Sequence, residues 1–432
     1  MTQTFRIKGL GGKKILSGEL SPHGAKNAVL KVLAATALFS ESIEISNIPD
    51  IEDVNSMILL LEKSGFFIKR LGARRLVCQP PRKTAARINT DIAKKLRASI
   101  VLTGPFLSRY GKISFPHPGG CVIGERPIDL FLSAFQKIGA RVSRNKDYYT
   151  INAPKNGLRG ANIFFENISV TATETLMLAA ILARGETILS NCAMEPEIKY
   201  LAEFLNSCGA RITGAGTPTI CVIGGELLRN TKNIVYKTPP DRIETGSFLI
   251  LGALCARDVT IKNCIPEHAA STIAILERMG VSLNIGKNYI KITNDFSGKG
   301  KKHFLATGVK THEYPGFPTD LQALMTVFLT QASGEALVFE TIFEGRLNYI
   351  ELLNRMGARI TSMDQHRILV KGPTPLRGRK LESPDLRAGL AYVIAALVAK
   401  GTSFIHNANY IDRGYEKIDE RLREIGADIE RV

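Results

Sequence analysis

The sequence predicts an α/β protein of the inside-out barrel type, with two lobes and six repeated βαβαββ-type units whose helices are buried, three units in each lobe. The first observation behind this prediction is a phrase that recurs six times in the 432 residues: a helix-like run, a glycine and an alternating strand. The second is that an almost wholly apolar helix-like segment precedes each copy. Helices that are apolar on all sides are typical of a protein interior, so we expect the strands to lie outside them.

The glycine in the repeated phrase marks each copy. Successive marker glycines are 69 to 77 residues apart, which is close to one sixth of the chain. They are Gly65, Gly139, Gly209, Gly280, Gly357 and Gly426. Each follows an amphipathic segment such as residues 51–65, and glycine is the usual residue just past a helix end. The even spacing therefore predicts six copies of one structural unit.

Within each unit the elements follow one order. The apolar helix comes first, and the six segments are 27–39, 97–111, 172–185, 244–258, 321–334 and 387–401. A short strand rich in β-branched residues follows, for example residues 185–191. The amphipathic helix comes next, the marker glycine ends it, and one or two further strands complete the unit.

We expect the two lobes to divide near residues 238–242, where a pair of prolines lies halfway along the chain. One lobe would consist of residues 1–25 plus 240–432, and the other, which carries the Cys121 loop, of residues 26–239. A strand over residues 4–10 is expected to pair with the lobe formed by the C-terminal half. The chain would then cross twice between the lobes.

Composition limits the classes of function. The net charge is +17, from 57 Lys and Arg against 40 Asp and Glu, and this excess favours anionic partners. Trp is absent and basic clusters are not interleaved with aromatic residues, so we expect no nucleic-acid binding. Apolar stretches such as 388–399 fall short of the roughly 20 residues that span a bilayer, so we expect no membrane association. The first residues contain no apolar signal segment, which predicts a cytoplasmic location.

Cysteine and histidine patterns predict neither disulfides nor a metal site. The seven cysteines are scattered without a CxxC pair, which indicates free thiols in a reducing compartment. The seven histidines show no metal-binding spacing, no Walker loop is present, and no GxGxxG opens a helix. We therefore expect no metal and no cofactor.

Polar residues gather at the starts of the six apolar segments, where free backbone N–H groups attract anions. These residues are Lys26, Asn27, Arg97, Ser169, Thr171, Arg242, Glu244, Asp320 and Arg387. The loops after the short strands add Arg126, Glu195, Glu197, Arg346 and Arg413. Six helix starts directed at one space between the lobes would form an anion-binding site, whereas helix capping is the alternative for any single position.

Two residues have chemical interpretations of their own. Cys121 lies in the loop 115–129, which contains three prolines and three glycines, and Arg126 follows it closely. A thiol beside a cation is reactive, and an incidental loop cysteine is the alternative. Asp320 could cap its helix, or it could act as a general base on a substrate hydroxyl.

Longer motifs resemble one enzyme family along the whole chain. They are GAKNA (24–28), LRAS (96–99), PGGCVIGERPIDL (118–130), EPEI (195–198), DRIETG (241–246), FPTD (317–320), FEGR (343–346), DLRA (385–388) and YIDRGYEKI (410–418). In these motifs the chain resembles the UDP-N-acetylglucosamine 1-carboxyvinyltransferases, which are enolpyruvyl transferases of the EPSP synthase superfamily. The resemblance implies transfer of the enolpyruvyl group of phosphoenolpyruvate to the 3-hydroxyl of UDP-N-acetylglucosamine, with release of phosphate. This reaction is the first committed step of peptidoglycan precursor synthesis.

The resemblance also implies roles for particular residues. The catalytic group would be Cys121, Asp320, Lys26 and Arg413. Phosphoenolpyruvate would be bound by Lys26, Asn27, Arg97, Arg126, Arg346, Arg387 and Arg413. The UDP-sugar would contact Asn27, Arg97, Arg126, Pro127, Ile128, Asp129, Leu130, Ser169, Val170, Thr171, Asp320 and Ile342. Asp320 would accept the proton of the 3-hydroxyl as it attacks C2, Cys121 would protonate C3, and the tetrahedral ketal would then lose phosphate.

Two alternatives stay open on the sequence. The family usually has Ser where this chain has His23 and commonly has Gly where it has Thr171, so a different nucleotide or sugar acceptor is one alternative. A basic binding protein that keeps the fold without the activity is the other, because a fold alone does not fix a function.

Overall fold

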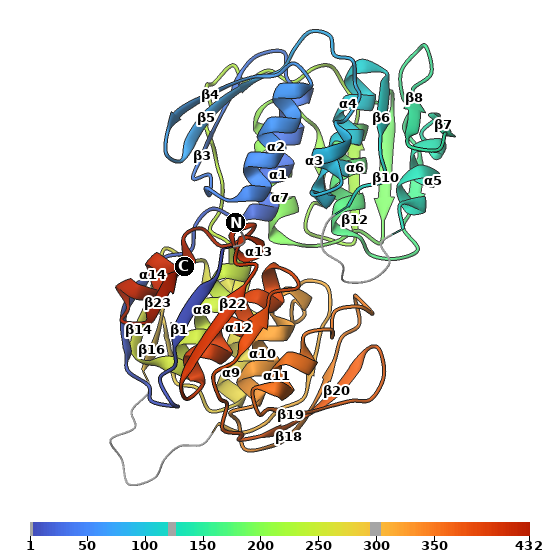
Figure 1. The fold of residues 1–432 in the computed structure, drawn as a ribbon. Helices are drawn as coiled ribbons and strands as arrows, with labels where there is room; N and C mark the ends of the chain where they lie inside the picture. Colours follow the sequence, from blue (N-terminus) through green and yellow to red (C-terminus); the bar gives the residue numbers. More distant parts are fainter. Residues whose placement is uncertain (1–2, 120–126, 294–303) are drawn as a thin grey trace. The chain divides into compact units, whose positions relative to one another are not determined.

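The computed structural model describes residues 3–119, 127–293 and 304–432. Their contacts divide the chain into two compact units. The inserted unit comprises the described residues of 24–239, and the C-terminal unit combines residues 3–23 with Pro240–Val432. Each unit has three sheets, so six sheets occur in the described part of the chain (Figure 1).

The inserted unit surrounds its buried helices with three sheets. In sheet order its strands are β13 (Tyr236–Lys237), β3 (Ile43–Ser46), β5 (Arg75–Gln79) and β4 (Phe67–Gly72), then β6 (Lys112–Phe115), β8 (Tyr149–Asn152) and β7 (Arg141–Arg144), and finally β11 (Ile212–Thr213), β12 (Thr219–Ile223), β10 (Glu186–Ser190) and β9 (Asn162–Phe164). Its helices are α1 (Lys26–Ala35), η1 (Thr36–Leu38), α2 (Glu52–Lys63), α3 (Thr90–Ala93), η2 (Arg97–Leu102), α4 (Thr103–Tyr110), α5 (Asp129–Lys137), α6 (Val170–Ala180) and α7 (Pro196–Ser207). The helix η2 contacts both α1 and α6, and α4 packs against α6.

The C-terminal unit repeats this arrangement. In sheet order its strands are β15 (Leu283–Ile285), β16 (Tyr289–Thr293), β14 (Ala256–Lys262) and β2 (Leu16–Leu20), then β17 (Val309–Lys310), β18 (Gly334–Phe339), β20 (Arg367–Gly372) and β19 (Arg359–Ser362), and finally β21 (Lys380–Glu382), β22 (Thr402–His406), β1 (Phe5–Lys8) and β23 (Asp428–Arg431). Its helices are α8 (Arg242–Cys255), η3 (Pro266–Ala269), α9 (Ala270–Arg278), η4 (Thr319–Leu321), α10 (Gln322–Leu329), α11 (Ile350–Arg355), α12 (Leu386–Val398), α13 (Asn409–Asp412) and α14 (Ile418–Glu424).

The helices predicted to be buried are indeed interior. In α12 all 13 residues are buried, and α8, α10 and α12 each contact the other two. Figure 1 shows these three helices among the strands of their unit. The inside-out arrangement predicted from the apolar segments is therefore confirmed, because helices without a polar face are stable only where water is excluded from every side.

In each of the six sequence repeats, the marker glycine directly follows the C-cap residue at the end of a helix. Their φ angles lie between 90° and 107°, a region that residues with a Cβ atom rarely adopt. The prediction of a repeated helix–glycine–strand phrase is therefore confirmed in its local geometry.

Two predicted helices are divided in the structure. Residues 27–39 form α1 and then the 3₁₀ helix η1. Residues 97–111 form the 3₁₀ helix η2 and then α4, instead of one continuous helix. Pro105 explains this second division, because proline has no N–H to donate to a carbonyl one turn earlier and is tolerated in the first turn of a new helix. The expectation of a single helix is wrong for both segments, although they are buried as predicted.

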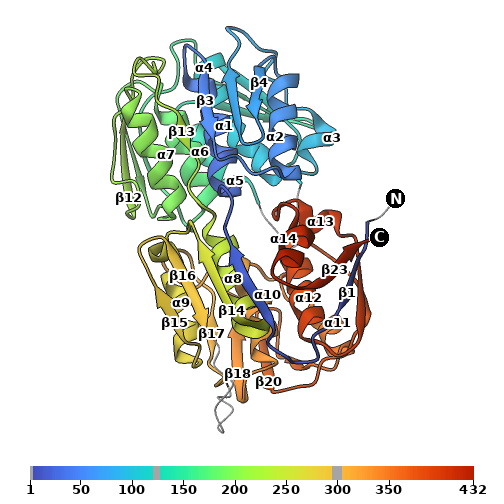
Figure 2. The ribbon, with the colours of Figure 1, turned by 90° about the vertical axis from the view of Figure 1, so that its left-hand side faces the viewer.

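The chain passes twice from one unit to the other. Strands next to these two passages pair with strands that are distant in the sequence. β2 pairs in parallel with β14, and β13 pairs in parallel with β3. β1 lies between β22 and β23 and is antiparallel to both, as Figure 2 shows for β1 and β23. Both crossing segments are fixed by backbone hydrogen bonds, from Asp241 N to His23 O at 2.8 Å and from Ala25 N to Pro239 O at 2.7 Å.

Candidate active site

The centre of the candidate site in the C-terminal unit is the carboxylate of Asp320, in η4. Its Oδ1 atom lies 2.8 Å from Nη2 of Arg346. Its Oδ2 atom accepts two hydrogen bonds from Arg387 in α12, at 2.8 Å from Nη2 and 3.1 Å from Nε. The side chains of Arg346 and Arg387 are 7% and 5% exposed, whereas that of Asp320 is 26% exposed. The arginines therefore hold the carboxylate from the interior, and Asp320 stays accessible.

The start of this helix tests the interpretation of Asp320 as a cap. The N-cap residue of η4 is Pro318, and no side-chain cap hydrogen bond forms at the described starts of η4 and α10. Asp241 and Asp385 are real caps, because each accepts backbone hydrogen bonds in the first turn of α8 or α12. The cap interpretation of Asp320 is therefore wrong.

A second carboxylate organises the Arg346 side of the cluster. Glu340, directly after β18, is fully buried. Its Oε2 accepts a hydrogen bond from Thr319 Oγ1 at 2.8 Å, and Thr319 accepts one from Arg346 Nη1 at 2.8 Å. Its Oε1 accepts the backbone N–H of Ile342 at 2.9 Å. Glu340 thus connects Ile342, for which the resemblance implies a contact with the UDP-sugar, with Arg346 of the Asp320 cluster.

Hydroxyl groups organise the Arg387 side. Nη1 of Arg387 donates to the hydroxyl of Tyr415 at 2.8 Å, and that hydroxyl lies 2.9 Å from Ser247 Oγ in α8. Burial opposes the charge of Arg387, but the Asp320 carboxylate and Tyr415 raise its pKa overall. Arg413 is half-buried just after α13, two residues before Tyr415. The Tyr415 hydrogen bond therefore ties the segment that carries Arg413 to the cluster.

In the inserted unit, predicted site residues lie at helix starts. Lys26 is the first residue of α1, and its Nζ lies 3.1 Å from Oδ2 of Asp53. Arg97 is the first residue of η2, and its Nη1 donates to the carbonyl of Pro118 at 3.2 Å. Ser169 caps α6 by accepting a backbone hydrogen bond in its first turn. Since η2 contacts α1 and α6, these three starts belong to one group of packed helices.

The remaining predicted residues are near the same ends. The half-buried ones in the first turns of α1, α5 and α6 are Asn27, Leu130, Val170 and Thr171, and Asp129 is exposed. Pro127 and Ile128 directly precede α5. Cys121 and Arg126 lie outside the described residues. The structure thus brings together Asp320, Arg346, Arg387 and Ile342 in one unit, and groups the helix starts of Lys26, Arg97 and Ser169 in the other.

A buried ion pair joins two of these helices, and the sequence analysis did not identify it. Nζ of Lys31 in α1 lies 2.8 Å from Oε2 of Glu174 in α6, and the two side chains are 6% and 0% exposed. Lys31 also donates to the carbonyl of Asn27, one turn earlier, at 3.0 Å. Burial raises the pKa of Glu174 to about 7, although Lys31 opposes the rise. The pair holds the first turn of α1 against α6.

Two charged residues singled out at the start of α8 have structural partners. Glu244 accepts hydrogen bonds from Arg421 Nη1 and from the backbone N–H of His23, each at 2.6 Å. The guanidinium of Arg242 lies over the ring of Tyr314, 5.5 Å from its centroid. These contacts pair both side chains with groups of the C-terminal unit.

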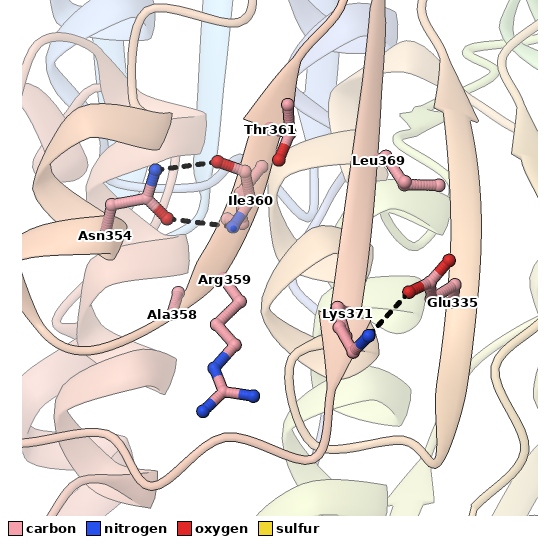
Figure 3. Close-up of a pocket in the computed structure, with 8 residues that line it drawn as sticks. All are labelled: Glu335, Asn354, Ala358, Arg359, Ile360, Thr361, Leu369 and Lys371. Carbon is pink, nitrogen blue, oxygen red and sulfur yellow. Dashed lines mark hydrogen bonds and ion pairs between the residues drawn. The ribbon is translucent and has the colours of Figure 1, made fainter.

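A surface pocket on the sheet that contains β18, β19 and β20 lies apart from the predicted residues (Figure 3). Lys371 Nζ lies 2.8 Å from Glu335 Oε1 across it. The side chain of Asn354 bonds both the N–H and the carbonyl of Ile360, at 3.0 and 2.8 Å. Because these polar groups pair with one another and no predicted site residue lines the pocket, we assign it no role.

Metal-binding groups and membrane-spanning helices are both absent from the described residues. In residues 3–119, 127–293 and 304–432, no group of three or more His, Cys, Asp or Glu side chains could hold a metal ion. Over the same ranges, no helix has both the length and the apolar character needed to cross a membrane. The six cysteines in these ranges are free thiols.

The sequence of this chain is similar to known proteins along nearly its full length. The family described as EPSP synthase (3-phosphoshikimate 1-carboxyvinyltransferase) matches residues 10–422. The UDP-N-acetylglucosamine 1-carboxyvinyltransferase of Pelagibacter ubique (strain HTCC1062) is 40% identical over 421 residues, which cover 98% of both chains. The protein of the same name from Campylobacter fetus subsp. fetus (strain 82-40) is 40% identical over 424 residues, again 98% of both chains.

Solved structures agree with the fold. The enolpyruvyl transferase NikO from Streptomyces tendae has a TM-score of 0.87 at 22% identity, covering 100% of this chain and 99% of its own. The EPSP synthase from Acinetobacter baumannii has a TM-score of 0.74 at 18% identity, with full coverage of both chains. At these identities the likeness concerns the fold alone, and it confirms the predicted fold class. The sequence matches over nearly the full length add the family: the chain belongs to the EPSP synthase family and, within it, to the UDP-N-acetylglucosamine 1-carboxyvinyltransferases.

Proposed function

We propose that this chain transfers the enolpyruvyl group of phosphoenolpyruvate to the 3-hydroxyl of UDP-N-acetylglucosamine and releases phosphate. The observation that carries the proposal is the Asp320 carboxylate, accessible on one side and held by Arg346 and Arg387 on the other. The names of relatives that match 98% of the chain support the choice of acceptor.

The proposed role of Asp320 is that of general base. As the sugar oxygen forms a bond to C2 of phosphoenolpyruvate, its proton passes to the carboxylate. The two arginines pair with the carboxylate oxygens and hold them in place as proton acceptors. The carboxylate accepts the proton most readily when C2 is already electron-poor. The bond that forms between the sugar oxygen and C2 then makes the hydroxyl proton more acidic. A positioned base of this kind contributes roughly 10²–10⁴-fold to the rate.

The proposed proton donor to C3 is Cys121. Protonation of C3 makes C2 electrophilic, and the bond to the sugar oxygen then gives a tetrahedral ketal. In the second half of the reaction C3 returns a proton to the Cys121 thiolate and the C2–O bond to phosphate breaks. The enol ether forms, and the departing phosphate takes up the proton that Asp320 accepted. The atoms balance without any cofactor.

The proposed anion-binding groups are the cations at helix starts. Lys26 and Arg97 add side-chain charge to the free N–H groups of α1 and η2. Arginine binds carboxylate and phosphate through two parallel hydrogen bonds, which suits both anionic ends of phosphoenolpyruvate. We assign Arg126, Arg346, Arg387 and Arg413 to the same set. The helix starts of α5 and α6 would contact the UDP-sugar.

Phosphate release tests the proposal directly. The purified protein is incubated with phosphoenolpyruvate alone, with UDP-N-acetylglucosamine added, and with other nucleotides and nucleotide sugars in its place. We expect release only with UDP-N-acetylglucosamine. Release only with a different acceptor would show that this acceptor is the substrate, and Thr171 and His23 would be the first residues to explain the difference. No release with any acceptor would favour a binding protein.

Cys121→Ala is expected to lower the rate of phosphate release by roughly 10²–10⁴-fold, because water is a poor substitute for a positioned acid. Cys221→Ala is the matched control: this thiol is partly exposed, and its Sγ donates to Glu186 at 3.1 Å. It should keep the normal rate. Full activity of Cys121→Ala would remove the thiol from the mechanism.

A cytoplasmic location is part of the same proposal. The free thiols of the six described cysteines suit a reducing compartment. Phosphoenolpyruvate and nucleotide sugars are metabolites of that compartment, so enzyme and substrates would meet there.

A further inference from the structure

A chain of hydrogen bonds lies behind Arg387, on the side away from Asp320. Arg387 Nη1 contacts the hydroxyl of Tyr415 at 2.8 Å, and Tyr415 contacts Ser247 Oγ at 2.9 Å. Ser247 Oγ in turn lies 2.8 Å from the carbonyl of Ile243, one turn earlier in α8. Arg387, Tyr415 and Ser247 are 4%, 0% and 1% exposed. Water therefore has no access to replace a missing partner in this chain.

The chemistry of the groups gives the chain one direction. A guanidinium has only donors, so Arg387 donates to Tyr415. Ser247 donates its only hydroxyl proton to the Ile243 carbonyl, so the Tyr415 hydroxyl donates its own proton to Ser247. Burial raises the pKa of Tyr415, although Arg387 opposes the rise, so the hydroxyl keeps the proton it donates. The other charge near this hydroxyl, Asp241, accepts the first backbone N–H groups of α8.

From this geometry we infer that Tyr415 is a positioning residue that orients Arg387 so that its Nε and Nη2 atoms meet the Asp320 carboxylate. The inference rests on the proposed function, in which Asp320 is the base. A guanidinium is planar, so fixing Nη1 at Tyr415 fixes the plane in which Nε and Nη2 point. Tyr415 itself has no direct role in the chemistry.

The same unit contains a matched control. Tyr349 is also 0% exposed, and its hydroxyl lies 2.8 Å from Thr326 Oγ1 in α10. Thr326 bonds the Gln322 carbonyl one turn earlier, as Ser247 bonds Ile243. Among the described residues, no hydrogen bond joins Tyr349 to Arg387 or Asp320. Tyr349→Phe therefore removes the same kind of buried contact without touching Arg387; the charges that act on the Tyr349 hydroxyl are those of Glu340 and Arg346.

The test compares Tyr415→Phe with Tyr349→Phe in steady-state kinetics. Both variants keep the ring and its packing, so similar melting temperatures are expected. Tyr415→Phe should lower kcat roughly 10- to 100-fold, the cost of leaving a buried charged donor without its acceptor. Tyr349→Phe should stay within about threefold of wild type. Ser247→Ala, which removes only the second bond of the chain, should lie between them.

Two further readouts separate positioning from general stability. With Arg387 misdirected, the Asp320 carboxylate takes up a proton more readily, so the acid limb of the kcat profile should move to higher pH by up to about 1 unit in Tyr415→Phe alone. In an Arg387→Lys background, Tyr415→Phe should cost almost nothing more, because both changes remove one interaction.

The outcomes are distinct. A normal kcat and pH profile for Tyr415→Phe, or fully additive losses with Arg387→Lys, would overturn the inference. Equal losses in Tyr415→Phe and Tyr349→Phe would also overturn it, since the effect would then be one of packing. Retention of full activity by Asp320→Asn would instead refute the proposed base, whatever Tyr415→Phe does.

Discussion

Asp320→Asn is expected to lower kcat by roughly 10²–10⁴-fold while UDP-N-acetylglucosamine still binds. The amide has the shape of the carboxylate but accepts no proton from the sugar hydroxyl. It also carries one oxygen in place of two, so it satisfies either Arg346 or Arg387 but not both. Single-turnover phosphate release measures the chemistry, and titration calorimetry with the nucleotide sugar measures binding.

The control for this variant is Asp364→Asn. Asp364 is also an arginine-paired aspartate of the C-terminal unit, with Oδ2 2.7 Å from Nε of Arg367, but its side chain is 37% exposed and it is not in the predicted site. Its replacement should leave kcat unchanged. If Asp320→Asn lost binding but turned over normally once saturated, Asp320 would be a ligand-binding group and not the base.

Lys31→Met is expected to reduce the free energy of unfolding by about 3–5 kcal/mol, because it leaves the Glu174 carboxylate buried without its cation. Urea unfolding gives the value. The double variant Lys31→Met/Glu174→Leu should regain most of the loss, since an apolar pair of similar volume avoids the desolvation of both charges. If the single and double variants were equally unstable, packing and not charge would be the cause.

Lys371→Met is the exposed counterpart. Lys371 and Glu335 are also 2.8 Å apart, but their side chains are 57% and 51% exposed. Because water screens such pairs, we expect a change of only about 0–1 kcal/mol. The comparison isolates burial as the variable.

The Glu174 carboxyl also gives this prediction a pH dependence. Its pKa is raised by burial to about 7, above the ordinary value of a glutamate. The folded state therefore holds a proton that the unfolded chain has already lost between about pH 4.5 and 7. Stability from this group is present below that window and falls as the pH rises through it. The loss in Lys31→Met should accordingly be smaller at pH 5 than at pH 8.

The fold could be predicted from the sequence because its signals are local and repeated. Each marker glycine follows an amphipathic helix, and its positive φ angle is a property of that one turn. The apolar segments needed only their own composition to be placed inside. Pro105 is an equally local signal for the division between η2 and α4, but the prediction of one helix over residues 97–111 did not take it into account.

The partners within the site could not be predicted in the same way. Asp320 and Arg387 are 67 positions apart, and Tyr415 and Ser247 are 168 apart, so their contact depends on how helices of different repeats pack. Whether Asp320 caps a helix or pairs with arginines could be seen only once the packing of these helices was known. Glu340 directly follows the strand GEALVF, but nothing local in the sequence says that its carboxylate oxygens accept hydrogen bonds from Thr319 and Ile342.

The position of β1 between β22 and β23 has a consequence for biosynthesis. Arg6 in β1 and Glu430 in β23 are hydrogen-bonded although 424 positions separate them. At about 5–20 residues per second, a ribosome delivers the second roughly 20–80 s after the first. The inserted unit, whose strands all come from one continuous stretch, can mature during that delay. In the C-terminal unit, the strand edges of β1 stay without their partners β22 and β23 until the end of the chain has been made.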